Sequence, residues 1–407
     1  MRSEKLYFKN SEGEKLAARL DLPLDGKPKA YALFAHCFTC SKNLKAVSNI
    51  NRALTREGIA VLRFDFTGLG ESEGDFAETN FSSNVADLIT AADFLKQQFA
   101  APELLIGHSL GGAAVLQAAA KIKSCKAVAT IGAPCDPVHV GHLLDSSREE
   151  IEAKGEAEIV LAGRKFTIKK QFLDDLEEKQ MKSTIRNLKR ALLILHSPID
   201  NVVGIDNAAQ IFQSALHPKS FVSLDKADHL LMAEDDSLYA GAVIAAWARK
   251  YIHLPLEEKK KVDLKDNRVI VETGSGYFTE IMANGHPLIA DEPVQVGGTD
   301  RGASPYELLL AALGACTSIT LRMYADRKQW PVEKIIVRLK HQKIHAQDCG
   351  ECESGSDRID RMEREIELLG PLEADQRQRL LEIADKCPVH RTLHSEVVVD
   401  TKLVADV

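Results

Sequence analysis

The chain has 407 residues, of which 45% are hydrophobic and 27% charged, and its formal net charge is −7. This length allows two to three domains, each with its own core, and the acidic balance argues against a nucleic-acid partner. No uninterrupted apolar run approaches the roughly 18 to 20 residues that span a bilayer, and the N-terminus lacks the apolar core of a signal peptide. Eight cysteines spread over so long a chain do not indicate a secreted disulfide framework. We therefore expect a cytoplasmic protein with no membrane partner.

Residues 1–253 alternate apolar strands with helical stretches, which predicts an α/β fold with a doubly wound, mostly parallel sheet. An opening hairpin is expected at 6–8 and 16–20. The expected later strands are 31–35, 59–64, 104–106, 127–131, 191–195 and 220–224. The expected helices are 43–57, 84–99, 110–121, 206–216 and 237–252. A highly charged insertion at about 137–190, with a possible hairpin at 159–168, lies where a cap over the site is expected.

The stretch 104–106 runs directly into Gly107-His108-Ser109-Leu110-Gly111, and an Ala-rich helical stretch follows. A strand, a G-x-S-x-G turn and a helix in this order form a nucleophile elbow. The two glycines leave room for a tight turn, which forces the serine into a strained backbone conformation. The sequence therefore predicts Ser109 as a nucleophile at the edge of the sheet.

A serine nucleophile needs a base, and the base needs a carboxylate that orients it. Asp200 follows the strand at 191–195, and His229 follows the last strand of this half. Because loops at the carboxyl ends of parallel strands converge, these side chains can meet Ser109. Asp206 and Asp225 remain alternatives for the acid. His196 and Asp228 compete weakly with the favoured pair, and His36 and His108 are expected to pack or bond locally.

A tetrahedral intermediate needs backbone N–H donors for its oxyanion. One is expected from Leu110, directly after the nucleophile. The other is expected from the loop that follows the strand at 31–35, with Phe38 as the first candidate and Cys37 as the second.

Residues 1–253 resemble the α/β-hydrolase family. The matching pieces are His36-Cys37-Phe38-Thr39, Asp65-Phe66-Thr67-Gly68-Leu69-Gly70-Glu71-Ser72, the elbow, and the Asp200 and His229 loops. The resemblance implies hydrolysis of an acyl ester through an acyl-enzyme on Ser109. Cys37 stands where such enzymes usually carry glycine. Asp65 is expected to anchor its glycine-rich loop rather than to react.

Residues 254–266 are rich in lysine and contain a proline, and we interpret them as a linker. Beyond them strands and helices are segregated, which predicts a smaller α+β domain over 267–407. Strands are expected at 269–273, 277–282, 335–341 and 396–403, a long helix from Pro305, and a helix at 374–385.

Ser304-Pro305-Tyr306-Glu307 is a capping box that opens the long helix. That helix carries Cys316, and Cys387 follows the last predicted helix. With Ser304-Pro305-x-Glu307-Leu308, Ala315-Cys316 and Cys387-Pro388-Val389-His390, this half resembles the OsmC/Ohr family of thiol peroxidases. The resemblance implies that Cys316 attacks an organic hydroperoxide, that Cys387 closes a disulfide, that an external dithiol resets the pair, and that two chains form an intertwined homodimer.

The same resemblance implies a glutamate and an arginine that support the peroxide site. Glu307 either only closes the capping box or takes the glutamate's role. Nine residues at about 100° each put it opposite Cys316, so that role requires a helix break, expected at Gly314. The stretch 281–296 contains no arginine, and Arg301 is the nearest candidate.

His341, His345, Cys349 and Cys352 have the residue types of a zinc site, but there is no second C-x-x-C pair. We favour an ordinary loop here over a metal or accessory redox pair, and we expect no metal and no cofactor.

Two hypotheses of different class follow. The first is a bifunctional enzyme that joins a serine hydrolase to a peroxidase, with an acyl substrate and an organic hydroperoxide as small-molecule partners. The second is a hydrolase whose OsmC-like half is a dimerisation or redox-sensing module. A further possibility keeps the Ser-His-Asp constellation for a different chemistry, because this scaffold hosts several.

Overall fold

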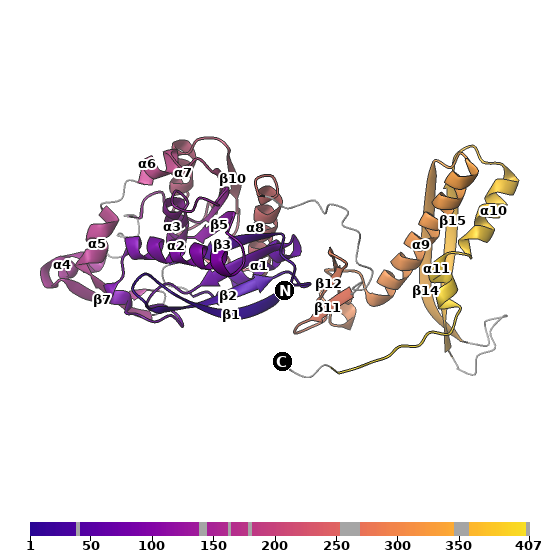
Figure 1. The fold of residues 1–407 in the computed structure, drawn as a ribbon, viewed down its shortest axis with the longest axis horizontal. Helices are drawn as coiled ribbons and strands as arrows, with labels where there is room; N and C mark the ends of the chain where they lie inside the picture. Colours follow the sequence, from indigo (N-terminus) through magenta and orange to yellow (C-terminus); the bar gives the residue numbers. More distant parts are fainter. Residues whose placement is uncertain are drawn as a thin grey trace. The chain divides into compact units, whose positions relative to one another are not determined.

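The computed structural model describes residues 1–37, 41–137, 145–161, 164–177, 181–252, 269–345 and 358–403. The chain divides into two compact units (Figure 1). The first holds Met1–Glu272 with Met282–Pro287, and the second holds Thr273–Ile281 with Leu288–Val407. The division thus falls at residue 272, a few residues after the expected domain start at 267. The expected linker at 254–266 lies outside the described residues.

The first unit is built on an eight-stranded sheet in the order β1-β2-β4-β3-β5-β6-β9-β10. The neighbours from β4 to β10 are parallel, whereas β1 and β2 are antiparallel additions at one edge. This is the mostly parallel α/β sheet that the alternation predicts. Its strands are β1 (Arg2–Lys9), β2 (Lys15–Leu22), β3 (Ala30–Ala35), β4 (Ile59–Phe64), β5 (Leu104–His108), β6 (Ala127–Ile131), β9 (Ala191–His196) and β10 (Lys219–Ser223).

Helices cover both faces of this sheet, which explains why its central strands are apolar throughout. In β4, Leu62 and Phe64 enter one core and Ile59 and Val61 enter the other. One core contains side chains of α2 (Phe81–Gln98), α3 (Leu110–Ala118) and α7 (Asp206–Ser214). The other contains side chains of α1 (Lys45–Arg56) and α8 (Glu234–Ala248).

The insertion forms a cap that packs on the start of α2 and on the short helix η1 (Phe76–Glu78). Asp175 accepts hydrogen bonds from the backbone and hydroxyl of Ser82, and Phe166 packs edge-on against Phe76. The hairpin expected at 159–168 is present as β7 and β8, paired antiparallel. The elements of the cap are α4 (Asp145–Lys154), β7 (Glu156–Leu161), β8 (Arg164–Lys169), α5 (Lys170–Glu177) and α6 (Met181–Arg186).

The second unit combines part of a small sheet with a long helix and a hairpin. The helix α9 packs against β14 and α10, and a small core of Leu321, Ala325, Leu380 and Ile383 lies between them. The strands β13 and β15 were not predicted. The strands of the small sheet, which contains residues of both units, are β11 (Val269–Thr273), β12 (Thr279–Ala283) and β13 (His286–Ala290). The remaining elements, all in the second unit, are α9 (Pro305–Lys328), β14 (Lys334–His345), β15 (Arg358–Leu369), α10 (Ala374–Ala384) and α11 (Pro388–Leu393).

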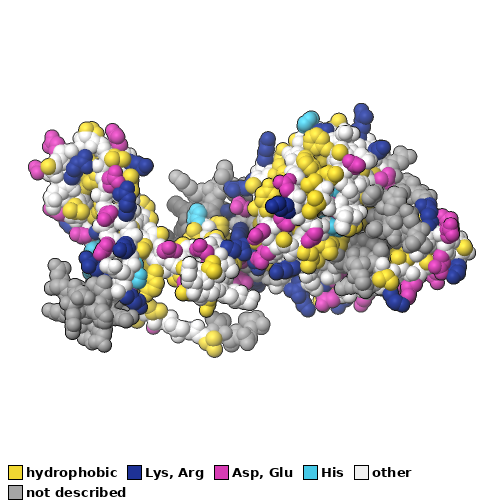
Figure 2. Space-filling view, turned by 180° about the vertical axis from the view of Figure 1, so that it is seen from behind, with side chains coloured by type: hydrophobic (Ala, Val, Ile, Leu, Met, Phe, Trp, Pro, Cys, Tyr) yellow, Lys and Arg dark blue, Asp and Glu magenta, His cyan; other side chains and the backbone are white. Residues whose placement is uncertain are grey.

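Much of the apolar surface of this unit is uncovered. The prediction of a strand at 396–403 is wrong, because this stretch pairs with no strand among the described residues, and Val398 and Val399 are 81% and 80% exposed. Ile319 and Met323 on α9 are also exposed. By length and composition alone α9 is apolar enough to cross a membrane, and 22% of its most apolar window is buried. Hydrophobic side chains reach the surface of both units (Figure 2).

Candidate active sites

Ser109 sits on a strained turn between β5 and α3. Its φ of 54° and ψ of −127° place a non-glycine residue in a region that side chains rarely adopt. The turn is possible only because its flanks lack Cβ atoms: a Cβ at Gly107 would lie 2.3 Å from the Gly111 carbonyl, and one at Gly111 would lie 2.5 Å from the carbonyls of Ala35 and His36. The predicted elbow is therefore present, with Ser109 at the carboxyl end of β5.

The structure brings the predicted base and acid to this serine. His229 Nε2 lies 3.0 Å from Ser109 Oγ, and His229 Nδ1 lies 2.7 Å from Asp200 Oδ2. All of these side chains are buried. Asp200 follows β9 and His229 follows β10, so parallel strands deliver the three residues to one edge of the sheet.

Asp200 is held as a carboxylate that accepts several hydrogen bonds. Burial alone would raise the pKa of Asp200, but the bond from His229 and backbone bonds from Val202 and Val203 bring it below its usual value. An ionised Asp200 fixes the Nδ1–H tautomer of His229, which leaves Nε2 free to accept the serine proton. Of the two alternative acids, Asp206 lies on α7 and Asp225 bonds to Ser223.

The neighbouring histidines support the site rather than compete for the proton. Burial lowers the pKa of His108 to about 4, and its Nε2 donates to the carbonyl of His229 at 2.6 Å. Burial also lowers the pKa of His36, whose Nδ1 donates to the Cys37 carbonyl. His196 donates to the Val203 carbonyl. These rings tie down the loops that carry His229, Asp200 and the expected oxyanion donors.

The structure describes two of the three residues expected as oxyanion donors. Leu110 is the first residue of α3, where backbone N–H groups have no intrahelical acceptor. Cys37 is buried just after β3 and is disulfide-bonded. The other described cysteines are free, so its partner is not among them. Phe38 lies outside the described residues.

A buried ion-pair cluster, which the sequence analysis missed, anchors the oxyanion loop. Lys42 Nζ lies 2.5 Å from Asp65 Oδ2, and the Lys42 backbone N–H donates to Asp65 Oδ1 at 2.7 Å. Arg63 donates to the Lys42 carbonyl and pairs with the buried Asp21. Asp65 also accepts from the Glu71 backbone, so it ties the glycine-rich loop to the oxyanion loop. The sequence feature that could have indicated this cluster is Arg63, a charged residue within the otherwise apolar run of β4.

The second unit brings Cys316 and Cys387 to one place. Cys316 is half-buried on α9, and its Sγ accepts from the Val389 backbone at 3.5 Å. Cys387 is fully buried at the start of α11 and accepts from the His390 backbone at 3.3 Å. Both are free thiols. The segment from Cys387 to His390 thus touches both sulfurs.

The supporting groups differ from those expected. The helix α9 runs unbroken through Gly314, and Glu307 closes the capping box with Ser304; these bonds lower the pKa of Glu307. The guanidinium of Arg301 lies over the ring of Phe278, 4.8 Å from its centroid. Arg364 on β15 instead donates to Thr317, the residue after Cys316, and sequence reasoning missed it because no local motif marks it.

No group of three or more metal-ligating side chains occurs among the described residues. His341 is bonded to Asp360 and stacks on Tyr306. Cys349 and Cys352 lie outside the described part of the chain.

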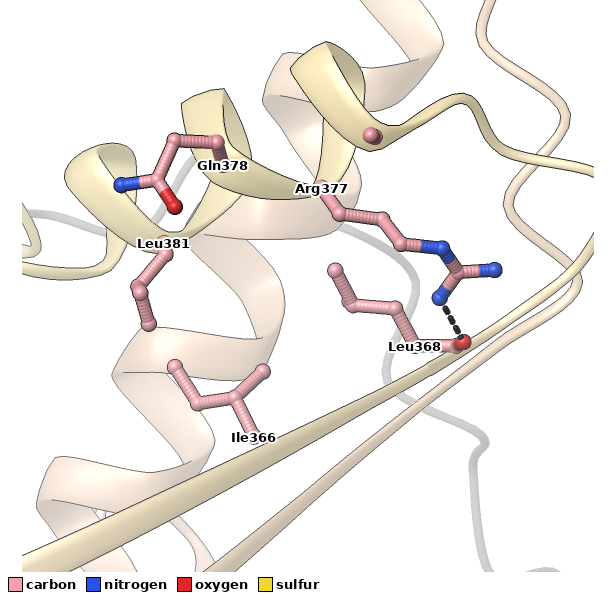
Figure 3. Close-up of a pocket in the computed structure, with 6 residues that line it drawn as sticks. Ile366, Leu368, Arg377, Gln378 and Leu381 are labelled. Carbon is pink, nitrogen blue, oxygen red and sulfur yellow. Dashed lines mark hydrogen bonds between the residues drawn. The ribbon is translucent and has the colours of Figure 1, made fainter.

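A pocket also opens between β15 and α10 (Figure 3). Ile366 and Leu368 project from the strand toward Leu381, and Arg377 bonds to the Leu368 carbonyl at 2.6 Å. The residues that line the pocket include no cysteine and no acid, so they provide no nucleophile and no general acid or base.

Comparisons with known proteins agree with this two-part architecture. Residues 26–145 match the family model described as serine aminopeptidase, S33, and residues 298–402 match that of the OsmC-like proteins. A crystal structure of an esterase domain from a Rhodothermus marinus protein is 57% identical, with a TM-score of 0.53; the match covers 62% of this chain and all of that one.

Two further relatives are more distant. Mouse palmitoyl-protein thioesterase ABHD10, mitochondrial, is 27% identical over 221 residues, which is 52% of this chain and 73% of that protein. The solved structure of Est1E from Butyrivibrio proteoclasticus with bound ferulic acid shares the fold at 20% identity with a TM-score of 0.51, and the match covers 60% of this chain and 98% of that one.

The chain belongs to the α/β-hydrolase family. It is a serine hydrolase whose relatives include esterases and thioesterases, and a C-terminal OsmC domain is fused to it.

Proposed function

We propose that the first unit hydrolyses acyl esters or thioesters through an acyl-enzyme on Ser109, with His229 as general base and acid and Asp200 as its orienting carboxylate. The observation that carries this is the continuous hydrogen-bond path from Ser109 Oγ through His229 to Asp200. His229 takes the hydroxyl proton as Ser109 attacks the acyl carbon, and returns it to the departing alcohol or thiol. Backbone N–H groups of Leu110 and the 36–42 loop hold the oxyanion.

The experiment is a pre-steady-state measurement with p-nitrophenyl acyl esters of increasing chain length. We expect a burst of nitrophenol equal to one per active site and an intact mass increased by the acyl group on Ser109. The variant Ser109→Ala loses both. Turnover that persists in Ser109→Ala, or the absence of any acyl adduct in a turning-over enzyme, contradicts the proposal.

For the second unit we propose reduction of organic hydroperoxides. The Cys316 thiolate attacks the peroxide, the O–O bond breaks, an alcohol leaves, and the sulfur becomes a sulfenic acid. Cys387 then forms the disulfide and releases water, and an external dithiol restores both thiols by exchange. The support is the convergence of both free cysteines on the 387–390 segment.

A second candidate is that this unit serves as a dimerisation or redox-sensing module without peroxidase turnover. The exposed apolar side chains of α9 and of the 396–403 stretch favour a second copy of this chain as their cover. We therefore also propose a homodimer through this unit. Cys316→Ser discriminates the two candidates: lost peroxide consumption supports the peroxidase, whereas changed esterase turnover alone supports the module.

We further propose a reason for the fusion, motivated by the fusion alone. The hydrolase releases an oxidised acyl chain from an ester, and the thiol unit reduces its hydroperoxide. Hydrolysis and peroxide consumption measured on one hydroperoxy-acyl ester test this, and preference for that substrate in neither assay rules it out. The cytoplasmic location is likewise a proposal, tested by cell fractionation.

A further inference from the structure

We propose that Arg364 and Thr317 position Cys387 for its attack on the oxidised Cys316. This inference rests on the proposed peroxidase chemistry and names two residues that the resemblance to the OsmC/Ohr family does not supply. Arg364 comes from β15 and Thr317 from α9, directly after Cys316.

The direction of the hydrogen bond at the arginine end of this path is fixed by chemistry. Arg364 Nη1 lies 3.1 Å from Thr317 Oγ1, and a guanidinium can only donate, so the threonine oxygen accepts. Thr317 Oγ1 lies 3.6 Å from Cys387 Sγ, within hydrogen-bond distance for sulfur. Either atom could donate while Cys387 is a thiol, but the thiolate that attacks can only accept, so the Thr317 hydroxyl then donates to the sulfur.

Burial makes this arrangement rigid. Thr317 and Cys387 have no exposed surface, and the side chain of Arg364 is 13% exposed. The guanidinium is also held by the Ala384 carbonyl at 3.2 Å and by Asp385 at 2.6 Å. Water therefore does not compete for the sulfur of Cys387, and the same arginine clamps the turn that leads from α10 to Cys387.

This arrangement acts on one step only. The Cys387 thiolate attacks the sulfur of the Cys316 sulfenic acid, the S–S bond forms, the S–O bond breaks, and the hydroxide leaves as water after taking up a proton. A hydroxyl donor and the His390 N–H both point at the attacking sulfur and hold it in one place. The first step, oxidation of Cys316, does not need them, because Cys316 has its own donor in the Val389 backbone.

The test separates the two steps in the full-length protein. Cumene hydroperoxide is added in one equivalent, and peptide mapping follows the Cys316 sulfenic acid, trapped with dimedone, and the Cys316–Cys387 disulfide over time. We expect Thr317→Val and Arg364→Met to oxidise Cys316 at the wild-type rate but to form the disulfide at least tenfold more slowly. Thr317→Ser restores the rate because it restores the hydroxyl. Thr320→Val, on the same helix, is the matched control.

A second route keeps the inference testable if the peroxide fails to oxidise Cys316, which would refute the proposed peroxidase function alone. Ellman's reagent converts the more exposed Cys316 to its thionitrobenzoate mixed disulfide, and attack by Cys387 releases thionitrobenzoate. The same ranking of variants is expected. An unchanged disulfide rate in Thr317→Val, or failure of Thr317→Ser to restore it, overturns the positioning role.

Discussion

Lys42 and Asp65 form an ion pair that solvent does not reach: the ammonium lies 2.5 Å from the carboxylate, and the side chains are 1% and 0% exposed. Burying two charges is costly unless each is paired and hydrogen-bonded. Asp65 additionally accepts from the Lys42 and Glu71 backbones, and the Lys42 carbonyl accepts from Arg63. The ion pair lies at the loop that follows β3, which is the loop expected to carry an oxyanion donor.

Lys42→Met therefore leaves Asp65 without its cation in the interior. We expect a loss of about 3 to 5 kcal/mol in the free energy of unfolding, as for other buried pairs that lose one partner, and a lower kcat with little change in KM. Lys45→Met is the matched control, because the Lys45 side chain is 70% exposed and its ammonium lies 4.0 Å from the Glu234 carboxylate, a long and exposed ion pair. Urea unfolding and ester kinetics measure both; equal stability of the two variants contradicts the anchor.

Asp200→Asn tests the triad acid. The amide still reaches His229 but favours the wrong tautomer, so we expect kcat for p-nitrophenyl esters to fall by roughly 10³ to 10⁴ with KM nearly unchanged. Asp206→Asn is the control, because that exposed side chain lies on α7, away from the His229 contact. An equal loss in both variants would mean that Asp200 has no special role.

Local and non-local features differed in how well the sequence predicted them. The elbow around Ser109 was predictable because strand, glycines and helix are adjacent in the chain, and the parallel sheet followed from its alternating pattern. Lys42, Arg63 and Arg364 were missed because their partners lie 20 or more residues away with no motif between them. The strand expected at 396–403 was wrong since β-propensity does not form a strand without a neighbour to pair with.

Asp87 makes the stability of the first unit depend on pH. Burial raises the pKa of Asp87 to about 6, although Thr67 donates two hydrogen bonds to it. The folded state therefore binds this proton more tightly than the unfolded chain does. Stability falls as pH rises from about 4 to about 6, and the loss is complete above that.

Asp87→Asn removes this dependence while it keeps an acceptor for Thr67. We compare the free energy of unfolding of the variant with that of the wild type at each pH. This difference is expected to favour the variant by about 3 kcal/mol more at pH 8 than at pH 4. Thermal unfolding at both pH values measures this change. Asp93→Asn changes an exposed position on the same helix and is expected to leave the stability unchanged at both pH values. A pH-independent difference between Asp87→Asn and the wild type speaks against the buried titration.

The exposed apolar surface of α9 leads to the last prediction. Ile319 and Met323 are 60% and 68% exposed and lie one helical turn apart, so a charge at either position faces whatever covers this helix. If a second copy covers it, Ile319→Asp and Met323→Asp turn a dimer into monomers, with sedimentation mass falling by half. Val160→Asp, which changes an equally exposed side chain on the cap, leaves the mass unchanged. A wild-type chain that sediments as a monomer at micromolar concentration refutes the dimer. If both α9 variants remain dimers, the dimer interface lies elsewhere. The apolar face of α9 is then not covered by a second copy of this chain.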